Sequence, residues 1–368
     1  MDKNKLMEIV SHFQTEGTFA DVAPLTAGLI NNSYKVFTLE KGKPDYVLQH
    51  INNSIFQDVE MLMANIMAVT RHLRKKLEAA HTADIDRHVL TFIPLRDNPD
   101  LYYYGNDETG YWRLMIFIED SVTKTEVTPE TSYEVGIAFG KFQADLADIP
   151  QQLGETIPNF HNMEFRLQQL QDAIKANQAG RLDKVRPLID AILEDAEDMC
   201  RGERLHREGK LPKRICHCDT KVNNILFDKD DNILCVIDLD TVMPNFVFSD
   251  IGDFLRWAAN TSAEDEPDLD KVNFNFAIFE PFIKGYLQSA GHFLLPIEIE
   301  NIPYATLLFP YMQAVRFLCD YLNGDTYYKT QYPEHNLIRT KTQFKLYQSV
   351  KDHQLQMAAF ITELLAHQ

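Results

Sequence analysis

The chain has 368 residues, of which 45% are hydrophobic and 24% are charged, as in an ordinary globular protein. Its net charge of −18 argues against a long polyanion as partner, because nucleic-acid binding depends on clustered Lys and Arg, and we expect no nucleic-acid partner. This length is sufficient for two lobes, each with its own core.

The cysteines and the apolar runs indicate the cellular setting. There are 5 cysteines, without the spacing of a disulfide scaffold, which fits a reducing cytosol. Cys216-His217-Cys218 invites a zinc interpretation, but no second Cys/His pair stands at zinc-finger spacing. The first residues contain no apolar signal core, and no apolar run reaches ~18 residues. We therefore expect a soluble, unprocessed, cytoplasmic protein with no membrane partner.

The first part of the chain predicts a small sheet, with one helix before its first strand and one after its third strand. Apolar residues recur at helical spacing from Leu6 to Phe13, which predicts a short amphipathic helix. The same spacing continues over a longer stretch from Val59 to Leu77 and predicts a long helix. Between these helices, turn-prone segments separate runs that predict antiparallel strands over 19–24, 33–39 and 46–51. Further strands are predicted over 89–95, 101–104 and 111–119.

From Ser121 onward the pattern becomes mainly helical. Thr128-Pro129-Glu130 is a good helix start, with Thr as the cap and Pro in the first turn. Further helices are predicted over 162–177, 182–207, 250–259, 272–289, 296–323 and 341–367. The sequence thus predicts an α+β chain. Residues 1–119 form a small antiparallel-sheet lobe with one long helix, and residues 120–368 form a larger, mainly helical lobe.

The segment 215–240 carries the strongest chemical pattern. Asp219 is followed by Asn224 and then by a pair of β-type runs, the second of which ends on Asp238. Phosphoryl transfer from ATP requires a carboxylate that orients a hydroxyl and oxygen ligands that hold Mg²⁺. We predict Asp219 as the base and Asn224 and Asp238 as metal ligands; the simpler alternative is loop capping by these residues. Asp240 either assists the metal or caps the following turn.

This pattern resembles the catalytic loop and metal-binding strand of the protein-kinase-like superfamily, in its branch of aminoglycoside phosphotransferases and choline kinases. Within that branch, the stretches 28–34, 217–244 and 315–328 are similar to the N-acetylhexosamine 1-kinases. The resemblance implies a protein-kinase-like two-lobed fold. It also implies a kinase that uses ATP and Mg²⁺ to phosphorylate the anomeric hydroxyl of a small-molecule sugar, GlcNAc or GalNAc. It implies nothing about oligomeric state.

The resemblance also assigns nucleotide-binding positions. Gly28 and Asn32 would belong to a phosphate-facing loop, with Ser33 supplying a further polar group. A single glycine makes this loop a weak motif, and an ordinary hairpin turn is the alternative. The backbone of Phe117, Ile118 and Glu119 would bind adenine at the hinge between the lobes.

The third predicted strand departs from the family pattern. With period-two alternation Val47 and Gln49 share a face, so Val47 would cover adenine and Gln49 would take the position of the phosphate-binding cation. Glutamine is not a cation, which leaves Lys35 or Lys221 as substitutes. Lys221, just after the predicted base, would neutralise charge on the transferring phosphate.

The acceptor is expected to lie against the helical lobe. Arginine bonds vicinal hydroxyls and aromatic rings stack on the apolar face of a sugar. From the residues alone, an interhelical salt bridge with packed tyrosines is the simpler interpretation of the region around Arg316. The resemblance favours Arg316 and Tyr327 contacting the sugar beside Asp219, with Trp257 and Ile30 lining the pocket near the N-acetyl group.

Several alternatives remain open. An aminoglycoside, choline, homoserine or another sugar would use the same machinery. A protein kinase is less consistent, because no glycine lies two residues after Asp238 and no Ala-Pro-Glu segment follows. A non-catalytic pseudokinase is supported only by Gln49.

Overall fold

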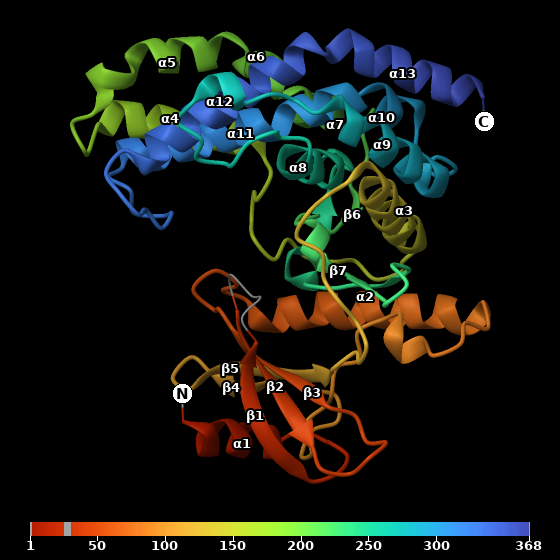
Figure 1. The fold of residues 1–368 in the computed structure, drawn as a ribbon. Coiled ribbons are helices and arrows are strands. Elements are labelled where there is room, and N and C mark those ends of the chain that lie inside the picture. Colours follow the sequence, from red (N-terminus) through yellow and green to blue (C-terminus); the bar gives the residue numbers. More distant parts are fainter. Residues whose placement is uncertain (1, 26–30, 368) are drawn as a thin grey trace. The chain divides into compact units, whose positions relative to one another are not determined.

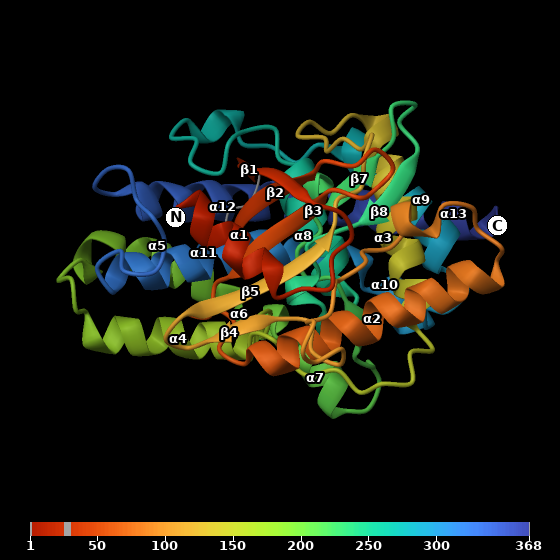
Figure 2. The same cartoon turned by 90° about the horizontal axis from the view of Figure 1, so that it is seen from below.

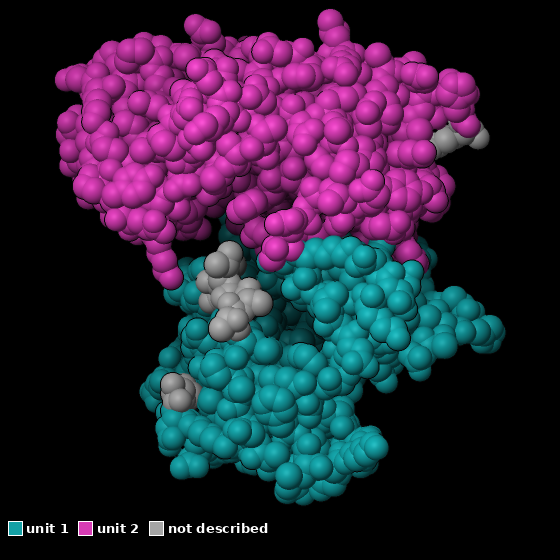
Figure 3. Space-filling model, viewed as in Figure 1, with its two compact units in different colours: residues 1–124, 148–158, 223–243 teal, residues 125–147, 159–222, 244–368 magenta. Residues whose placement is uncertain are grey.

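A computed structural model describes residues 2–25 and 31–367 and divides the chain into two compact units, coloured separately in Figure 3. Unit 1 comprises residues 1–124, 148–158 and 223–243, and unit 2 comprises residues 125–147, 159–222 and 244–368. Each unit is therefore discontinuous in sequence. The division into continuous lobes at residue 119 stays a prediction.

Unit 1 is built on a 5-stranded antiparallel sheet with the order β1-β2-β3-β5-β4 (Figures 1 and 2). Its strands are β1 (Phe19–Leu25), β2 (Asn32–Thr38), β3 (Tyr46–Ile51), β4 (Tyr104–Asn106) and β5 (Gly110–Ile116). In Figure 1, α1 (Lys3–Ser11) and α2 (Val59–Ala79) lie on opposite sides of this sheet.

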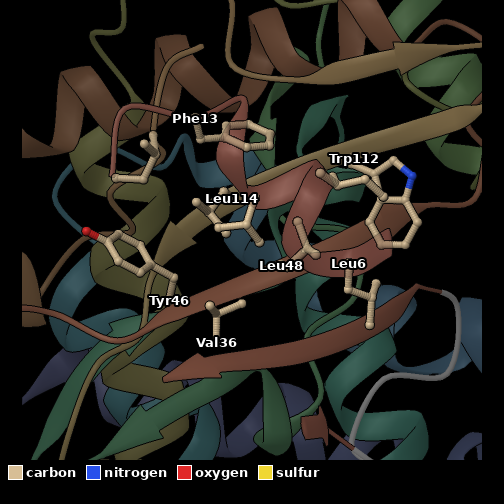
Figure 4. Packing of buried hydrophobic residues seen from close by; sticks show 10 residues of the cluster. Leu6, Phe13, Val36, Tyr46, Leu48, Trp112 and Leu114 are labelled. Atoms are coloured by element: carbon tan, nitrogen blue, oxygen red, sulfur yellow. The ribbon is translucent and has the colours of Figure 1, made fainter. Parts of the chain in front are cut away.

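The hydrophobic core of unit 1 lies between α1 and one face of the sheet, as Figure 4 shows. Its buried members are Leu6, Ile9, Val10, Phe13, Val36, Tyr46, Leu48, Ile93, Trp112 and Leu114. Successive side chains of a strand point to opposite faces. Alternation therefore places Ser33, Val47, Gln49 and Arg113 together on the other face of the sheet.

Unit 1 also contains a hairpin from later in the chain, formed by β7 (Ile225–Phe227) and β8 (Ile233–Val236). The Asp228 carboxylate organises its turn by accepting hydrogen bonds from the backbone N–H groups of Asp230 and Asn232 at 2.8 and 2.9 Å. A single 3-10 turn, η3 (Leu239–Thr241), follows β8.

Unit 2 is mainly helical. Its helices are α3 (Pro129–Leu146), α4 (Met163–Ala176), α5 (Leu182–Glu194), α6 (Ala196–Met199), α7 (Arg201–Arg207), α8 (Phe248–Ala258), α9 (Phe276–Ala290), α10 (Pro296–Glu300), α11 (Ile302–Leu322), α12 (His335–Asp352) and α13 (Gln354–Ala366). The remaining short strands are β6 (Arg214–Cys216) and β9 (Met243–Asn245). Helix α11 packs against α4, α8 and α12, which explains why most of its residues are buried.

Local chemistry accounts for several helix starts. The Thr128 hydroxyl accepts a hydrogen bond from the Thr131 N–H at 3.2 Å, and Pro129 opens α3. Asn162 caps α4 by accepting from the Phe165 N–H at 3.0 Å. Side-chain caps of this kind can be read from sequence because they act over a few residues.

The predicted α+β, protein-kinase-like fold is confirmed, but some element boundaries were wrong. Residues 89–95 form no strand and make only isolated bridges, because Pro94 has no N–H with which to continue a ladder. Residues 182–207 form separate helices rather than one. The first break is at Asp195, whose carboxylate accepts hydrogen bonds from Tyr347 and Lys351 on α12, a tertiary contact without a local signal. Across residues 2–25 and 31–367, no helix is long and apolar enough to cross a membrane.

Candidate active site

The loop 217–220 in unit 2 has a side-chain partner for each of its backbone N–H groups. Asp250 accepts hydrogen bonds from the N–H groups of His217 and Cys218 at 3.0 and 2.8 Å. The His217 ring accepts from the Asp219 N–H at 3.3 Å, and Asp253 accepts from the Thr220 N–H at 3.0 Å. Both anchoring carboxylates lie near the start of α8. The conformation of the loop is therefore determined by side chains from α8 and by its own histidine.

The anchors of this loop are buried. His217 is fully buried, with its ring packed edge-on against Phe139 and Phe142 of α3. Burial raises the pKa of Asp250, although the neighbouring His217 and the loop N–H groups favour its carboxylate form. Asp250 also accepts a hydrogen bond from Gln143 Nε2 at 2.6 Å.

Asp219, the predicted base, lies beside Lys221. Lys221 Nζ is 2.8 Å from Asp219 Oδ1, and these side chains are 27% and 19% exposed respectively. Burial alone would lower the pKa of Lys221, but the carboxylates of Asp219 and Asp253 outweigh burial and raise it. The structure thus keeps a protonated ammonium next to the predicted base.

The predicted metal ligands lie at one end of the β7–β8 hairpin in unit 1. The Ile237 N–H donates to the Asn224 carbonyl at 2.9 Å, and Asp238 is the next residue. Asp238 has a φ of 59°, in the left-handed region that Asp tolerates better than most residues. An amide and a carboxylate provide the oxygen donors that Mg²⁺ prefers. Within the described part of the chain, no group of 3 or more His, Cys, Asp and Glu side chains could hold a metal ion.

Asp240 has contacts that neither sequence-based interpretation anticipated. It is 2% exposed, and its Oδ1 lies 2.6 Å from Arg113 Nη1 on β5. Its Oδ2 accepts a hydrogen bond from Asn31 Nδ2 at 2.7 Å. Both of these partners belong to unit 1, as Asp240 does. Asp240 therefore links η3 to the sheet.

A family model described as the APH phosphotransferase enzyme family matches residues 21–282. The chain belongs to this family. Membership makes it a small-molecule phosphotransferase of the aminoglycoside-kinase and choline-kinase type, with an alcohol group as acceptor.

Solved structures share the fold. An amicoumacin kinase in complex with AMP-PNP and Ca²⁺ matches with a TM-score of 0.61 and 14% identity, covering 94% of this chain and 93% of that chain. A spectinomycin phosphotransferase matches with a TM-score of 0.57 and 12% identity, covering 97% and 99%. A choline kinase from Cryptosporidium parvum matches with a TM-score of 0.54 and 14% identity, covering 94% and 93%. At these identities the likeness establishes the fold only.

In this phosphotransferase, several of the predicted nucleotide positions lie on the sheet face opposite α1. Gly28 and Ile30 lie outside the described residues. Alternation along β2 places Asn32 and Ser33 on opposite faces, so only Ser33 shares the face of Val47 and Gln49. The Gln49 amide bridges two neighbours, because its Nε2 donates to Ser33 Oγ at 2.9 Å and its Oε1 accepts from Arg113 Nε at 3.0 Å.

Lys35, one proposed substitute for the missing cation, is occupied by other partners. Its Nζ lies 3.0 Å from Asp45 Oδ2 and 3.1 Å from Glu119 Oε1. It also lies 3.7 Å from the centre of the Phe117 ring. These contacts hold the Lys35 ammonium beside the predicted hinge segment rather than beside Gln49.

The predicted hinge 117–119 already uses part of its backbone. The Phe117 N–H donates to the Asp45 carbonyl at 2.8 Å, and the Ile118 carbonyl accepts from Ser121 Oγ at 2.6 Å. Among the described residues, the N–H groups of Ile118 and Glu119 have no hydrogen-bond partner in the chain. These are the backbone donors that adenine could use.

The predicted acceptor residues of unit 2 lie around α11. On this helix only Arg316 and Cys319 are not fully buried. The Arg316 guanidinium lies 5.6 Å from the centre of the Tyr328 ring, and Tyr327 packs edge-on against that ring. Tyr327 itself is 68% exposed, so its ring is available to a ligand.

Sequence reasoning missed the positive groups near Arg316. Burial, with a further contribution from the charge of Arg316, lowers the pKa of Arg166, on α4, to about 10. Burial also lowers the pKa of His161, with contributions from Arg316, Arg166 and Arg256. Arg256 lies 5.4 Å from the ring of Trp257, a predicted pocket residue that is 47% exposed. No motif marks Arg166 or His161, because helix packing alone brings them towards Arg316.

Proposed function

We propose that this phosphotransferase is an ATP-dependent, Mg²⁺-assisted kinase for the anomeric hydroxyl of N-acetylhexosamines. The observation that carries this proposal is the loop 217–220, whose backbone N–H groups are all bound by side chains while Asp219 remains partly exposed. A base for phosphoryl transfer must hold its hydroxyl in one orientation, and a loop anchored in this way supplies that rigidity.

In this proposal each polar residue has a separate role. Asp219 accepts a hydrogen bond from the sugar hydroxyl and takes its proton as the new O–P bond forms, while the bond from the γ-phosphorus to its bridging oxygen breaks and ADP leaves with that oxygen. Lys221, kept protonated by Asp219 and Asp253, neutralises charge on the transferring phosphoryl group. Asn224 and Asp238 would hold Mg²⁺, which when bound supplies charge neutralisation to the nucleotide phosphates.

Nucleotide binding is assigned to unit 1. Val47 lies on the sheet face opposite α1 and would cover adenine. The Ile118 and Glu119 N–H groups would bind the base, since the Phe117 N–H has a partner in the chain. Gly28 and Ser33 would contact the phosphates, whereas the side chain of Asn32 points to the other face of the sheet.

The charges near α11 support a sugar as acceptor. Arg166, Arg256 and Arg316 all lie close enough to His161 to lower its pKa. Arg256 is paired with Glu264 at 2.8 Å, whereas Arg166 and Arg316 form no salt bridge within the described residues, and their positive charge opposes a cationic acceptor such as choline or an aminoglycoside. A neutral sugar suits the same groups, with Arg316 bonding hydroxyls and with Tyr327 and Trp257 offering apolar faces.

Replacement of the base tests the reaction. Asp219→Asn is expected to reduce N-acetylhexosamine-dependent ATP consumption by at least ~100-fold, because proton transfer by a positioned side chain contributes that much. Binding of ATP, measured by titration calorimetry, should stay within about twofold because Asp219 acts on the hydroxyl. Asp183→Asn, at a side chain that is 96% exposed, is the matched control. Turnover within about tenfold of wild type would show that Asp219 is not the base.

An acceptor panel tests the substrate. GlcNAc, GalNAc, choline and an aminoglycoside are incubated with ATP and the full-length protein, and products are identified by ³¹P NMR. We expect a sugar 1-phosphate from the N-acetylhexosamines. A product phosphorylated at the 6-hydroxyl, or turnover of choline alone, would contradict the proposed acceptor.

A further inference from the structure

The position expected for a phosphate-binding cation on β3 is occupied by the neutral Gln49. Directly across the β3–β5 pairing, however, Gln49 is in register with Arg113. Residues paired in register across an antiparallel sheet point to the same face. A guanidinium therefore lies beside the expected position of the cation, supplied by the neighbouring strand.

Hydrogen bonds set the orientation of this guanidinium. Arg113 Nε donates to Gln49 Oε1 at 3.0 Å, and Gln49 Nε2 donates to Ser33 Oγ at 2.9 Å. Because the nitrogen of the Gln49 amide donates to Ser33, its oxygen faces Arg113. Gln49 thus orients Arg113 and does not itself take the role of the cation.

Asp240 supplies the acidic partner. Its Oδ1 is 2.6 Å from Arg113 Nη1, and these side chains are 3% and 2% exposed. Neither of these atoms has a hydrogen bond with good geometry among the described residues, so their contact is an ion pair with unmade hydrogen bonds. In protein kinases the phosphate-binding lysine is likewise held by a carboxylate. Buried charges with unmade hydrogen bonds are costly, which indicates a use beyond packing.

We propose that Arg113 binds the α- and β-phosphates of the nucleotide, with Gln49 and Asp240 as the residues that position it. This inference rests on the proposed use of ATP. Among the described residues, Arg113 Nη1 has no hydrogen-bond partner of good geometry, so this guanidinium retains donor capacity for phosphate oxygens. Arginine donors form a planar fork that matches phosphate geometry.

Arg113 and Asp240 are both buried, and further hydrogen bonds within unit 1 hold this pair. At 2% exposure the guanidinium is covered, and Asp240 is bound to Asn31, the first described residue after the predicted phosphate loop. Asn31 Oδ1 in turn accepts from the Asn52 N–H at 3.0 Å.

The test compares nucleotides with and without phosphates. ADP and adenosine are titrated separately into the full-length wild type and Arg113→Gln by calorimetry, without divalent cations. We expect the variant to bind ADP about 10- to 100-fold more weakly, as for loss of a charge-assisted contact, and adenosine within about twofold. Arg96→Gln is the matched control, since Arg96 is an exposed arginine of the same unit.

A swapped variant keeps the test independent of folding defects. Gln49→Arg combined with Arg113→Gln moves the guanidinium to the paired strand and should recover at least about threefold of the lost ADP affinity. If Arg113→Gln does not fold, Arg113→Lys takes its place, because lysine keeps the charge but lacks the planar fork, and weaker ADP binding is again expected.

The outcomes separate this inference from the proposed function. If the folded variant has the same ratio of ADP affinity to adenosine affinity as wild type, the role of Arg113 is overturned. This holds whether both affinities are unchanged or both are weakened equally. A wild type that binds neither ligand would instead refute the use of ATP.

Discussion

Asp320 offers a direct test of how the predicted acceptor site is built. Its Oδ1 accepts hydrogen bonds from the backbone N–H groups of Thr326 and Tyr327 at 2.9 and 2.8 Å. Its Oδ2 accepts from the Tyr328 N–H at 3.0 Å and from Asn336 Nδ2 at 2.8 Å. Asp320 thus holds the segment that carries the tyrosines against α11.

Asp320→Asn is an isosteric change with a calculable effect. An amide has one acceptor oxygen, so its NH₂ group must face one pair of these donors in either orientation. Each buried donor left unsatisfied costs about 1–3 kcal/mol, which gives about 2–6 kcal/mol for the pair. The segment can avoid this cost by detaching from α11, and we expect it to do so.

Amide hydrogen exchange measures the release directly. A loss of ~2 kcal/mol corresponds to roughly 30-fold faster exchange at residues 326–328. If Tyr327 contacts the sugar, the KM for the acceptor should rise while the affinity for ATP is unchanged. Asp183→Asn, at a 96% exposed carboxylate, is the control. Unchanged exchange at these amides would refute the anchoring argument, whatever happened to activity.

Other predictions concern stability. In Gly285→Ala, the new Cβ would lie 2.2 Å from the Tyr133 carbonyl oxygen, so α3 and α9 must separate at a cost of about 1–3 kcal/mol, measured by urea unfolding. A variant more stable than wild type, as helix propensity alone predicts, would contradict this close approach. Burial is the main cause that raises the pKa of Glu203 above its usual 4.5. The protonated side chain therefore contributes full stability below pH 4.5, and this contribution is lost as the pH rises through the raised pKa. Glu203→Gln should therefore gain stability relative to wild type as the pH rises above 4.5; a difference independent of pH would disprove the assignment.

Local signals were sufficient for much of the fold. The strands 19–24, 33–39 and 46–51 and the long helix from Val59 were predicted closely, because alternation and helical spacing act over neighbouring residues. The break at Asp195 was missed because residues on α12 hold it, far along the chain.

Sequence also predicted which residues carry the chemistry of the catalytic loop. Asp219, Asn224 and Asp238 stand within one short stretch, so their spacing is visible without coordinates, and all of them lie within the range that the family model matches. Their individual roles stay predictions.

Only the tertiary structure revealed Arg113 beside Gln49, Asp240 as the partner of Arg113, and the arginines around His161. Arg113 and Gln49 come from different strands, and the positive cluster comes from different helices, so no spacing in the sequence connects them. Strand register and helix packing set these distances. Both depend on the burial of side chains across the whole unit, which a local sequence pattern does not report.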